Sequence, residues 1–321
     1  MNKELLETVG LSHFKESDFS AREIILRSGK NTKVWVHGPT GHGVLDPENW
    51  MEDDYYEEDY REEFSGDSKG KNIESERHFK MFRDLNKRQF EQFFEHLDSE
   101  TSLLEIGCSF GGVVDYVVDF GIGNHHAVEP NKKDALYVKE KYPSVKVHNS
   151  LLEDAGLEKD SFDIAVSFEV LEHTTSPKDF LLKAKDCLKK EGLIHIEVPN
   201  HYDVLLSCFK EEINYNTFYY HKAHIHYFTP ESLKSLCEEC GFSGEVTSFL
   251  MYPFFNHVYW LQNQGPQPTA TQALSLPLPT EEKTEAQKQI NDFFRNAEKE
   301  YENLINLHKL GDCIVFQGVK K

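Results

Sequence analysis

From about residue 102 to residue 198, short apolar runs alternate with stretches in which apolar residues recur every three or four positions. The runs are typical of buried β-strands, and the wider spacing is typical of amphipathic helices. Strands are expected at residues 102–106, 125–129, 145–148, 162–168 and 193–198. Helices are expected between them, at residues 111–120, 132–141 and 177–190. Because such alternation requires parallel strands joined by right-handed crossovers, it predicts an α/β fold with a doubly wound sheet.

The segments on either side of this alternation have weaker patterns. Residues 72–97 carry phenylalanines at helical spacing and are expected to form a helix that leads into the sheet. Residues 1–64 lack a helical period, but the strand-like pieces 23–26 and 33–36 are expected to form a hairpin. Beyond residue 228 we expect a helix at 230–240, a strand at 245–249, an exposed linker at 262–280, a helix at 281–307 and a strand at 313–317.

These patterns divide the chain into three regions. Residues 1–70 are predicted to form a small N-terminal lobe, and residues 71–250 the α/β core. Within the core, residues 201–228 form an aromatic and histidine-rich insertion that is expected to lie across the pocket as a lid. Residues 251–321 are predicted to supply an arm, a C-terminal helix and the final strand of the core sheet.

Composition narrows the classes of partner. The chain has 321 residues and a net charge of −20, which repels a phosphate backbone, so nucleic acid is not expected as a partner. No apolar run reaches the length that spans a bilayer, and the N-terminus lacks the layout of a signal peptide. A cytoplasmic protein with no membrane partner is therefore expected. Cys237 and Cys240 lack a second pair of zinc ligands in the sequence, and we interpret them as thiols packed on a helix.

A glycine turn and an acidic residue provide the first candidate chemistry. Gly107 and Gly111 follow the strand expected at 102–106, and Glu129 closes the next expected strand. Glycine allows the backbone to turn tightly and to approach a ligand, and a carboxylate can accept hydrogen bonds from both ribose hydroxyls. Ligands of doubly wound sheets bind beyond the carboxyl ends of the strands. The pattern therefore predicts a ligand that contains an adenosine-like ribose.

Taken together, the glycine turn, Glu129, the strand at 162–168 and the segment Lys189-Lys190-Glu191-Gly192-Leu193 resemble, in order and spacing, the class I S-adenosylmethionine-dependent methyltransferases. The resemblance covers about residues 75–250. It implies a seven-stranded sheet whose last strand is inserted antiparallel, and S-adenosyl-L-methionine as the cofactor. A dinucleotide dehydrogenase is the alternative for a glycine-rich turn, but its regular G-x-G-x-x-G pattern is absent.

The resemblance also implies a set of cofactor contacts. Gly107 and Gly111 would bend beneath the methionine part, Glu129 would hold the ribose, and Ser150 and Leu151 would flank the adenine. Ser109 and Ser150 depart from the residues common in the family, glycine and an acidic residue. The full set expected to border the cofactor is Glu105, Gly107, Cys108, Gly111, Glu129, Pro130, Ser150, Leu151, Phe168 and Glu169.

Candidate catalytic residues follow the fourth expected strand. A helical turn after it would bring Glu169, Glu172 and His173 to one face. This E-x-x-E-H block, with the later His224, resembles the magnesium-dependent quinone and small-RNA 2′-O-methyltransferases. Two carboxylates and a histidine suit a divalent ion, but they equally suit a hydrogen-bond network at the start of a helix. Our main interpretation therefore includes no bound metal.

The insertion contributes further histidines. The segment from Ala223 to Leu233 resembles one that precedes a helix in sugar methyltransferases, where the position matching His224 is catalytic or lies in the acceptor site. Thr229 is expected to cap the following helix. His224, His173 and His201 are the candidate bases, because histidine titrates near neutral pH. For each insertion histidine other than His224, including His201, a partly exposed loop position is the favoured interpretation.

The N-terminal lobe weakly resembles the lobe that precedes sugar and polysaccharide-associated methyltransferases, although its zinc-binding cysteines are absent. The acidic stretch around Tyr55, Tyr56 and Tyr60 is expected to be solvated, or alternatively to fold over the pocket. The predicted function is methylation of a small polar acceptor, most simply a hydroxyl of a sugar or of a glycan precursor in polysaccharide biosynthesis.

Three further interpretations stay open. A metal-assisted O-methyltransferase would use Glu169, Glu172, His173 and His224. A non-catalytic protein would bind a partner through the aromatic arm at residues 249–260. A homo-oligomer is open as well.

Overall fold

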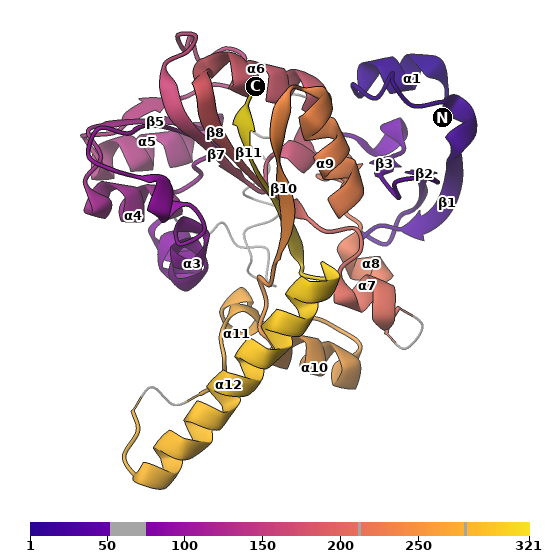
Figure 1. Ribbon diagram of the computed structural model, residues 1–321. Coiled ribbons are helices and arrows are strands. Elements are labelled where there is room, and N and C mark those ends of the chain that lie inside the picture. The colour runs from indigo at the N-terminus through magenta and orange to yellow at the C-terminus, as the bar shows by residue number, and fades with distance from the viewer. Residues whose placement is uncertain (52–74, 211–212, 279–280) are drawn as a thin grey trace.

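The computed structural model describes residues 1–51, 75–210, 213–278 and 281–321 (Figure 1). Its centre is a seven-stranded sheet with the strand order β10-β11-β8-β7-β4-β5-β6. The strands are β4 (Ser102–Ile106), β5 (Asn124–Val128), β6 (Lys146–His148), β7 (Phe162–Phe168), β8 (Leu188–Pro199), β10 (Phe242–Phe249) and β11 (Cys313–Lys320). Neighbouring strands from β6 to β8 pair in parallel, and β11 runs antiparallel to both β8 and β10. The mostly parallel doubly wound sheet is confirmed.

Helices cover both faces of the sheet. Because successive side chains of a strand point to opposite faces, both sets of side chains are buried. Leu103 packs with α4 (Gly112–Phe120), and its neighbour Leu104 packs with α6 (Pro177–Cys187) and α9 (Pro230–Glu239). The face that carries α4 is also covered by α3 (Ser75–Phe90) and α5 (Lys132–Lys141), on the left in Figure 1. Short 3-10 turns lie at η1 (Glu16–Asp18), η2 (Pro47–Asn49), η4 (Phe94–His96) and η5 (Leu171–His173).

Helix α9 begins where the sequence predicts. The side chain of Thr229 accepts a hydrogen bond from the amide of Ser232, and the Ser232 hydroxyl accepts one from the amide of Thr229, with Pro230 in the first turn. This reciprocal cap satisfies two amides that the helix itself leaves without partners. Cys237 and Cys240 are buried in the core beneath this helix, as packed thiols.

A second sheet contains the N-terminal residues. It has the order β1-β2-β3-β9, formed by β1 (Phe19–Ile25), β2 (Asn31–His37), β3 (Gly43–Leu45) and β9 (His226–Tyr227). The predicted hairpin is confirmed in β1 and β2. Helix α1 (Lys3–Thr8), capped by Asn2, was not predicted because it is too short to show a period. The predicted boundary near residue 70 and the tyrosines at 55, 56 and 60 lie outside the described residues.

Strand β9 comes from the predicted insertion, so residues 201–228 are joined to the N-terminal sheet through its pairing with β3. The insertion also contains α7 (Val204–Cys208) and α8 (Asn216–Tyr219). The interpretation that its histidines are partly exposed loop residues is wrong, because His201 and His226 are 4% and 1% exposed. Their rings pack among the aromatic side chains that fill the junction of the two sheets.

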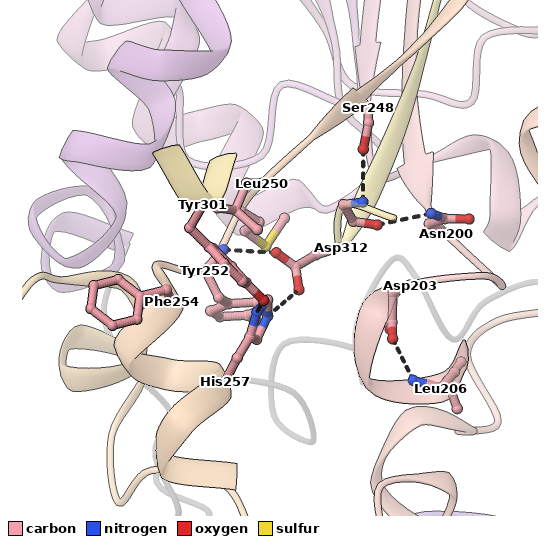
Figure 2. Close-up of polar contacts among 12 residues, drawn as sticks. Asn200, Asp203, Leu206, Ser248, Leu250, Tyr252, Phe254, His257, Tyr301 and Asp312 are labelled. Carbon is pink, nitrogen blue, oxygen red and sulfur yellow. Dashed lines mark hydrogen bonds and ion pairs between the residues drawn. The ribbon is translucent and has the colours of Figure 1, made fainter. Parts of the chain in front are cut away.

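The C-terminal region attaches to the sheet through a buried His–Asp pair (Figure 2). His257 of α10 (Phe254–Asn263) contacts Asp312 Oδ1 through Nε2 at 3.0 Å and the hydroxyl of Tyr301 through Nδ1 at 2.7 Å. Burial is the largest single effect and lowers the pKa of His257, but the charge of Asp312, the hydrogen bond to it and the nearby carboxylates together raise the pKa. Tyr301 lies on α12 (Glu285–His308), which extends away from the sheet in Figure 1. The pair therefore fixes α10 and α12 against the start of β11.

The alternative of an aromatic binding arm at residues 249–260 loses the ring of Trp260, which is 3% exposed and packs against the rings of Tyr215 and Phe218. The linker expected at residues 262–280 has no buried residue among those that are described, but it contains a helix, α11 (Ala270–Leu274), whose Leu274 packs against a cluster that includes Leu85 of α3. A five-residue helix capped by Thr269 is too short to show a core pattern. Among the described residues, no helix is both long and apolar enough to cross a bilayer.

One buried histidine of β8 yields a test of the fold. The His195 ring lies between those of Phe93 and Phe168, at centroid distances of 5.8 and 5.3 Å, and among the described residues neither ring nitrogen has a hydrogen-bond partner. Burial lowers the pKa of His195 to about 3. As the pH falls below 6.5, the unfolded chain gains a proton that the folded chain does not, so the wild type loses stability.

We expect His195→Phe to raise the free energy of unfolding at pH 8, because it removes two unpaired buried nitrogens. Its advantage over the wild type should grow by about 2 kcal/mol between pH 8 and pH 5, at about 1.4 kcal/mol per pH unit below 6.5. Urea titrations at the two pH values measure this. The control, His308→Phe at an exposed position of α12, should leave the pH dependence unchanged. An advantage for His195→Phe that does not vary with pH would contradict the buried, neutral imidazole.

Candidate active site

The turn after β4 is tied to the end of β5. The amides of Gly107 and Cys108 both donate to the carbonyl of Val128. Gly107 has a φ of +79°, and a Cβ there would lie 2.3 Å from Cγ2 of Val170. Glycine is therefore required at this position both by the backbone conformation and by the side chain that packs against the turn. Ser109, where many methyltransferases have glycine, also has a positive φ of +51°.

Glu129 directly follows β5 and contacts this turn. Its carboxylate accepts hydrogen bonds from the amide of Ser109 at 2.7 Å and from the amide of Asn131 at 2.8 Å. The side chain of Asn149 donates to the carbonyls of Glu129 and Pro130, which fixes the loop that follows β5. The two features that the sequence singles out for a ribose are thus adjacent.

Two observations at this edge of the sheet bear on the prediction of a nucleoside with an acidic tail. The Ser150 hydroxyl, just beyond β6, is buried with no hydrogen-bond partner among the described residues, so a polar group of a ligand can satisfy it. Helix α4 begins at Gly111 with no side-chain cap on its first amides, which leaves donors for a carboxylate. Leu151, which is 44% exposed, provides an apolar surface beside Ser150.

Three predicted cofactor residues direct their side chains elsewhere. Cys108 is buried among the side chains under α4 and α5, and Phe168 packs against the rings of Phe93 and His195. Glu105 is 3% exposed and faces His125, with 3.4 Å between Oε2 and Nε2. Because successive side chains of a strand point to opposite faces, Glu105 of β4 and Phe168 of β7 lie between the sheet and its helices. Cys108, just beyond β4, packs under α4 and α5. We therefore do not carry their side chains forward as ligand contacts.

The prediction that one helical turn brings Glu169 and Glu172 to the same face is wrong. Glu169 has a φ of +55°, and the turn that follows is the short η5. The Glu169 carboxylate instead accepts a hydrogen bond from the thiol of Cys313 and lies near Glu197 of β8. Burial, followed by the charge of Glu197, raises the pKa of Glu169 to about 8, and burial raises the pKa of Glu197 to about 7.

The sequence analysis did not single out Glu197 or Cys313. The only signal was an acidic residue inside the apolar run that forms β8. Glu197 accepts hydrogen bonds from the side chains of Gln89 and Gln92 at 2.6 and 3.0 Å. These contacts join helix α3 to the carboxyl end of β8.

Glu172, His173 and His224 come together at the same edge. Oε1 of Glu172 lies 3.6 Å from Nε2 of His173 and 3.7 Å from Nε2 of His224, and Glu172 is 1% exposed. Neither carboxylate oxygen has a hydrogen-bond partner among the described residues. Burial, followed by the charge of Glu169, raises the pKa of Glu172. This cluster, named below the Glu172 cluster, is assembled from η5 and from residues that precede β9.

The tautomer of His173 can be assigned from its partner. Its Nδ1 lies 2.7 Å from the carbonyl oxygen of Ala223, which can only accept, so Nδ1 carries the proton. In the neutral imidazole, Nε2 then directs a lone pair toward the carboxylate of Glu172. Two lone pairs facing one another in a buried site require a proton or a cation between them.

His224 and His201 have different surroundings. Burial and the nearby His221, whose ring centroid is 3.8 Å away, lower the pKa of His224, so its imidazole is neutral at pH 7. His201 contacts the Gly41 carbonyl through Nδ1 at 3.0 Å and the hydroxyl of Tyr220 through Nε2 at 2.9 Å. Of the three candidate bases, His173 and His224 belong to the Glu172 cluster, and His201 has partners at both nitrogens.

The donor set of the Glu172 cluster fits a divalent cation. Its three ligand atoms lie within 4.8 Å of one another, and the same holds for those of Glu169, Glu197 and Cys313. A carboxylate with two imidazoles suits ions such as Mn²⁺ or Zn²⁺. The second cluster suits them less well, because burial raises the pKa of the Cys313 thiol and keeps it protonated beside the two carboxyls.

Comparisons with known proteins agree with this architecture. A methyltransferase-domain family model matches residues 77–245. A probable S-adenosylmethionine-dependent methyltransferase of Mycobacterium tuberculosis is 29% identical over 98 residues, which are 30% of this chain and 35% of that protein. One of Mycolicibacterium smegmatis is 26% identical over 112 residues, 34% of this chain and 42% of that protein. The matches thus span less than half of these relatives.

Comparison with solved structures gives two methyltransferases at low similarity. A methyltransferase from Archaeoglobus fulgidus gives a TM-score of 0.49 at 18% identity, covering 74% of this chain and 94% of that one. A possible histamine N-methyltransferase from Thermotoga maritima gives 0.48 at 20% identity, covering 77% and 94%. At these scores neither likeness bears on the acceptor. The family model, however, covers more than half of the chain, from α3 into β10. The chain therefore belongs to the methyltransferase-domain family, and S-adenosylmethionine is its cofactor.

Proposed function

We propose that this protein transfers a methyl group from S-adenosylmethionine to a hydroxyl of a small polar acceptor, such as a sugar or a cell-surface glycan precursor. The observation that supports it best is the Glu172 cluster, a buried carboxylate facing two imidazoles at the carboxyl edge of the sheet. The same edge carries Glu129 and the glycine turn. The class of acceptor rests on the sequence resemblance and on the need of a hydroxyl, unlike an amine, for help in losing its proton.

The positions of these residues suggest a role for each of them in the reaction. S-adenosylmethionine supplies a methyl group on a positively charged sulfur, which is already a good leaving group. Glu129 and the amides around Ser109 would hold the ribose, and Ser150 the edge of the base. The protein then has to align the acceptor hydroxyl and accept its proton. His224 suits that role, because its buried imidazole is neutral and can take up a proton beside the carboxylate of Glu172.

A second candidate mechanism has a specific observation in its favour. Nε2 of His173 lies 3.6 Å from the carboxylate of Glu172, whose oxygens have no hydrogen-bond partner among the described residues, and a divalent cation would bind both groups. Glu172, His173 and His224 would hold it. A bound cation lowers the pKa of a hydroxyl that contacts it, which would replace the base. Glu169, which the sequence analysis included among the ligands, lies in the cluster with Cys313 and has no part in this version.

His224→Asn is expected to lower kcat by about 100-fold, the usual contribution of a general base, while the affinity for S-adenosylmethionine stays the same. Transfer of a labelled methyl group to a panel of sugars, with amines as the comparison, measures kcat, and calorimetry measures cofactor affinity. His221→Asn is the control, since its ring contacts His224 rather than Glu172. Equal kcat values for His224→Asn and the wild type would contradict the base, and methylation of amines alone would contradict the acceptor class.

The cation version predicts one binding site for Mn²⁺ in metal-free protein. Glu172→Gln should weaken this binding by about 10-fold or more, because the amide replaces the charged ligand. Glu169→Gln, three residues earlier, should change it far less, since that carboxyl belongs to the other cluster and acts on Glu172 through its charge. Isothermal calorimetry of the two variants decides the point. Methyl transfer that persists at full rate in chelator, with no Mn²⁺ bound, excludes the cation and leaves His224 as the base.

A further inference from the structure

An open pocket of about 830 Å³ lies between the N-terminal sheet and the insertion. One wall is formed by β1 and the other by the region of α7 and α8, which lies below β1 in Figure 1. The floor contains the apolar side chains of Ile24, Leu206 and Leu310. Neither Glu129 nor the Glu172 cluster lines this pocket, so it is separate from the methyl-transfer site.

Buried hydrogen bonds hold the inner wall. The carbonyl of Gly41 can only accept, so Nδ1 of His201 donates to it, and Nε2 then accepts from the hydroxyl of Tyr220. The positive charge of Arg22, on β1, acts on the same hydroxyl and opposes the rise that burial causes in the pKa of Tyr220. His201, one of the predicted bases, therefore positions Tyr220 at the pocket wall, beside Arg22.

The lining groups have a common chemistry. Three side-chain amides, two hydroxyls, one exposed aromatic ring and two cations surround the space, supplied by Asn31, Asn214, Asn216, Ser207, Thr217, Tyr202, Arg22 and Lys210. Amides donate and accept at once, which matches the hydroxyl groups of a sugar. The ring of Tyr202 is 47% exposed and offers an apolar face to the C–H side of a sugar ring. A guanidinium pairs in bidentate fashion with a carboxylate or a phosphate.

We propose that this pocket binds a carbohydrate that carries an acidic group, with the acid on Arg22 and a sugar ring on Tyr202. The acidic group is a carboxylate or a phosphate, both of which fit the fork of a guanidinium. Glu23 also borders the pocket, but it follows Arg22 on a strand whose successive side chains point to opposite faces, so no ligand contact is assigned to it. The inference goes beyond the proposed function, because this binding needs neither the cofactor nor the Glu172 cluster.

Calorimetry without S-adenosylmethionine tests the pocket with four probes. These are a trimer of galacturonic acid, the neutral trimer of galactose, glucose 1-phosphate and inorganic phosphate. The wild type should bind the acidic trimer, glucose 1-phosphate or both at least about 10-fold more tightly than the neutral trimer, as expected for a charge-assisted pair. Arg22→Gln should remove that difference. Lys30→Gln removes an exposed cation from the β1–β2 turn, outside the pocket. This variant should retain the difference in affinity between the acidic and the neutral probes.

Tyr202→Ala should weaken the binding of acidic and neutral sugars alike. It removes the aromatic surface on which the sugar ring is proposed to lie, and it leaves Arg22, the partner of the acidic group, in place. Thermal unfolding and cofactor affinity of each variant show that the fold and the methyl-transfer site are intact. The proposal is overturned if none of the sugar probes binds, if Arg22→Gln and Lys30→Gln behave alike, or if inorganic phosphate binds as tightly as glucose 1-phosphate. Because this experiment measures no methyl transfer, a failure to bind sugars would not contradict the proposed methyl transfer. Likewise, a failure of the methyl-transfer assays would not contradict binding in this pocket.

Discussion

The buried carboxylate of Glu172 is the constraint on which the rest of the candidate site depends. Its side chain is 1% exposed and has no hydrogen-bond partner among the described residues, so a negative charge there is costly unless a proton or a cation lies between the carboxylate and the two imidazoles that face it. The backbone carbonyl of the same residue accepts from the amide of Ile225, and its neighbour His173 contacts the carbonyl of Ala223. A 3-10 turn after β7 is thereby attached to a segment about 50 residues later.

This attachment links the two sheets. Ile225 immediately precedes β9, which completes the N-terminal sheet, so the turn after β7 holds that sheet in place as well. On its other side the edge of the core sheet carries the glycine turn and Glu129, joined by the hydrogen bond from Ser109. The His257–Asp312 pair fixes the C-terminal helices at the start of β11, at the same edge. Four chain segments therefore converge where parallel strands end, the position at which doubly wound sheets bind ligands.

Much of the core could be predicted because its signals are local. The strand at residues 162–168 and the helix at residues 132–141 coincide with β7 and α5, since each is bounded by clear changes of periodicity. The cap of α9 by Thr229 was likewise readable from Thr-Pro before an apolar pattern. Short elements such as α1 and α11 were missed, because five or six residues show no period.

The site was predicted only in part, because side-chain direction depends on non-local packing. The adjacency of Glu129 and the turn follows from parallel pairing of β4 with β5. The separation of Glu169 from Glu172 could not be predicted in this way. It arises because Glu169 has a left-handed backbone conformation, which does not occur in the helical turn that the sequence predicts. The role of His201 as a support for Tyr220 depends on Gly41, 160 positions away, which no local pattern could connect.

A crystal structure with S-adenosylhomocysteine tests the central claim most directly, that Glu129 holds the nucleoside and the Glu172 cluster receives the acceptor. We expect the ribose hydroxyls on the carboxylate of Glu129, the adenine beside Ser150, and the sulfur facing the space next to His224 and Glu172. A nucleoside bound elsewhere, or a sulfur that points away from the Glu172 cluster, would contradict the account.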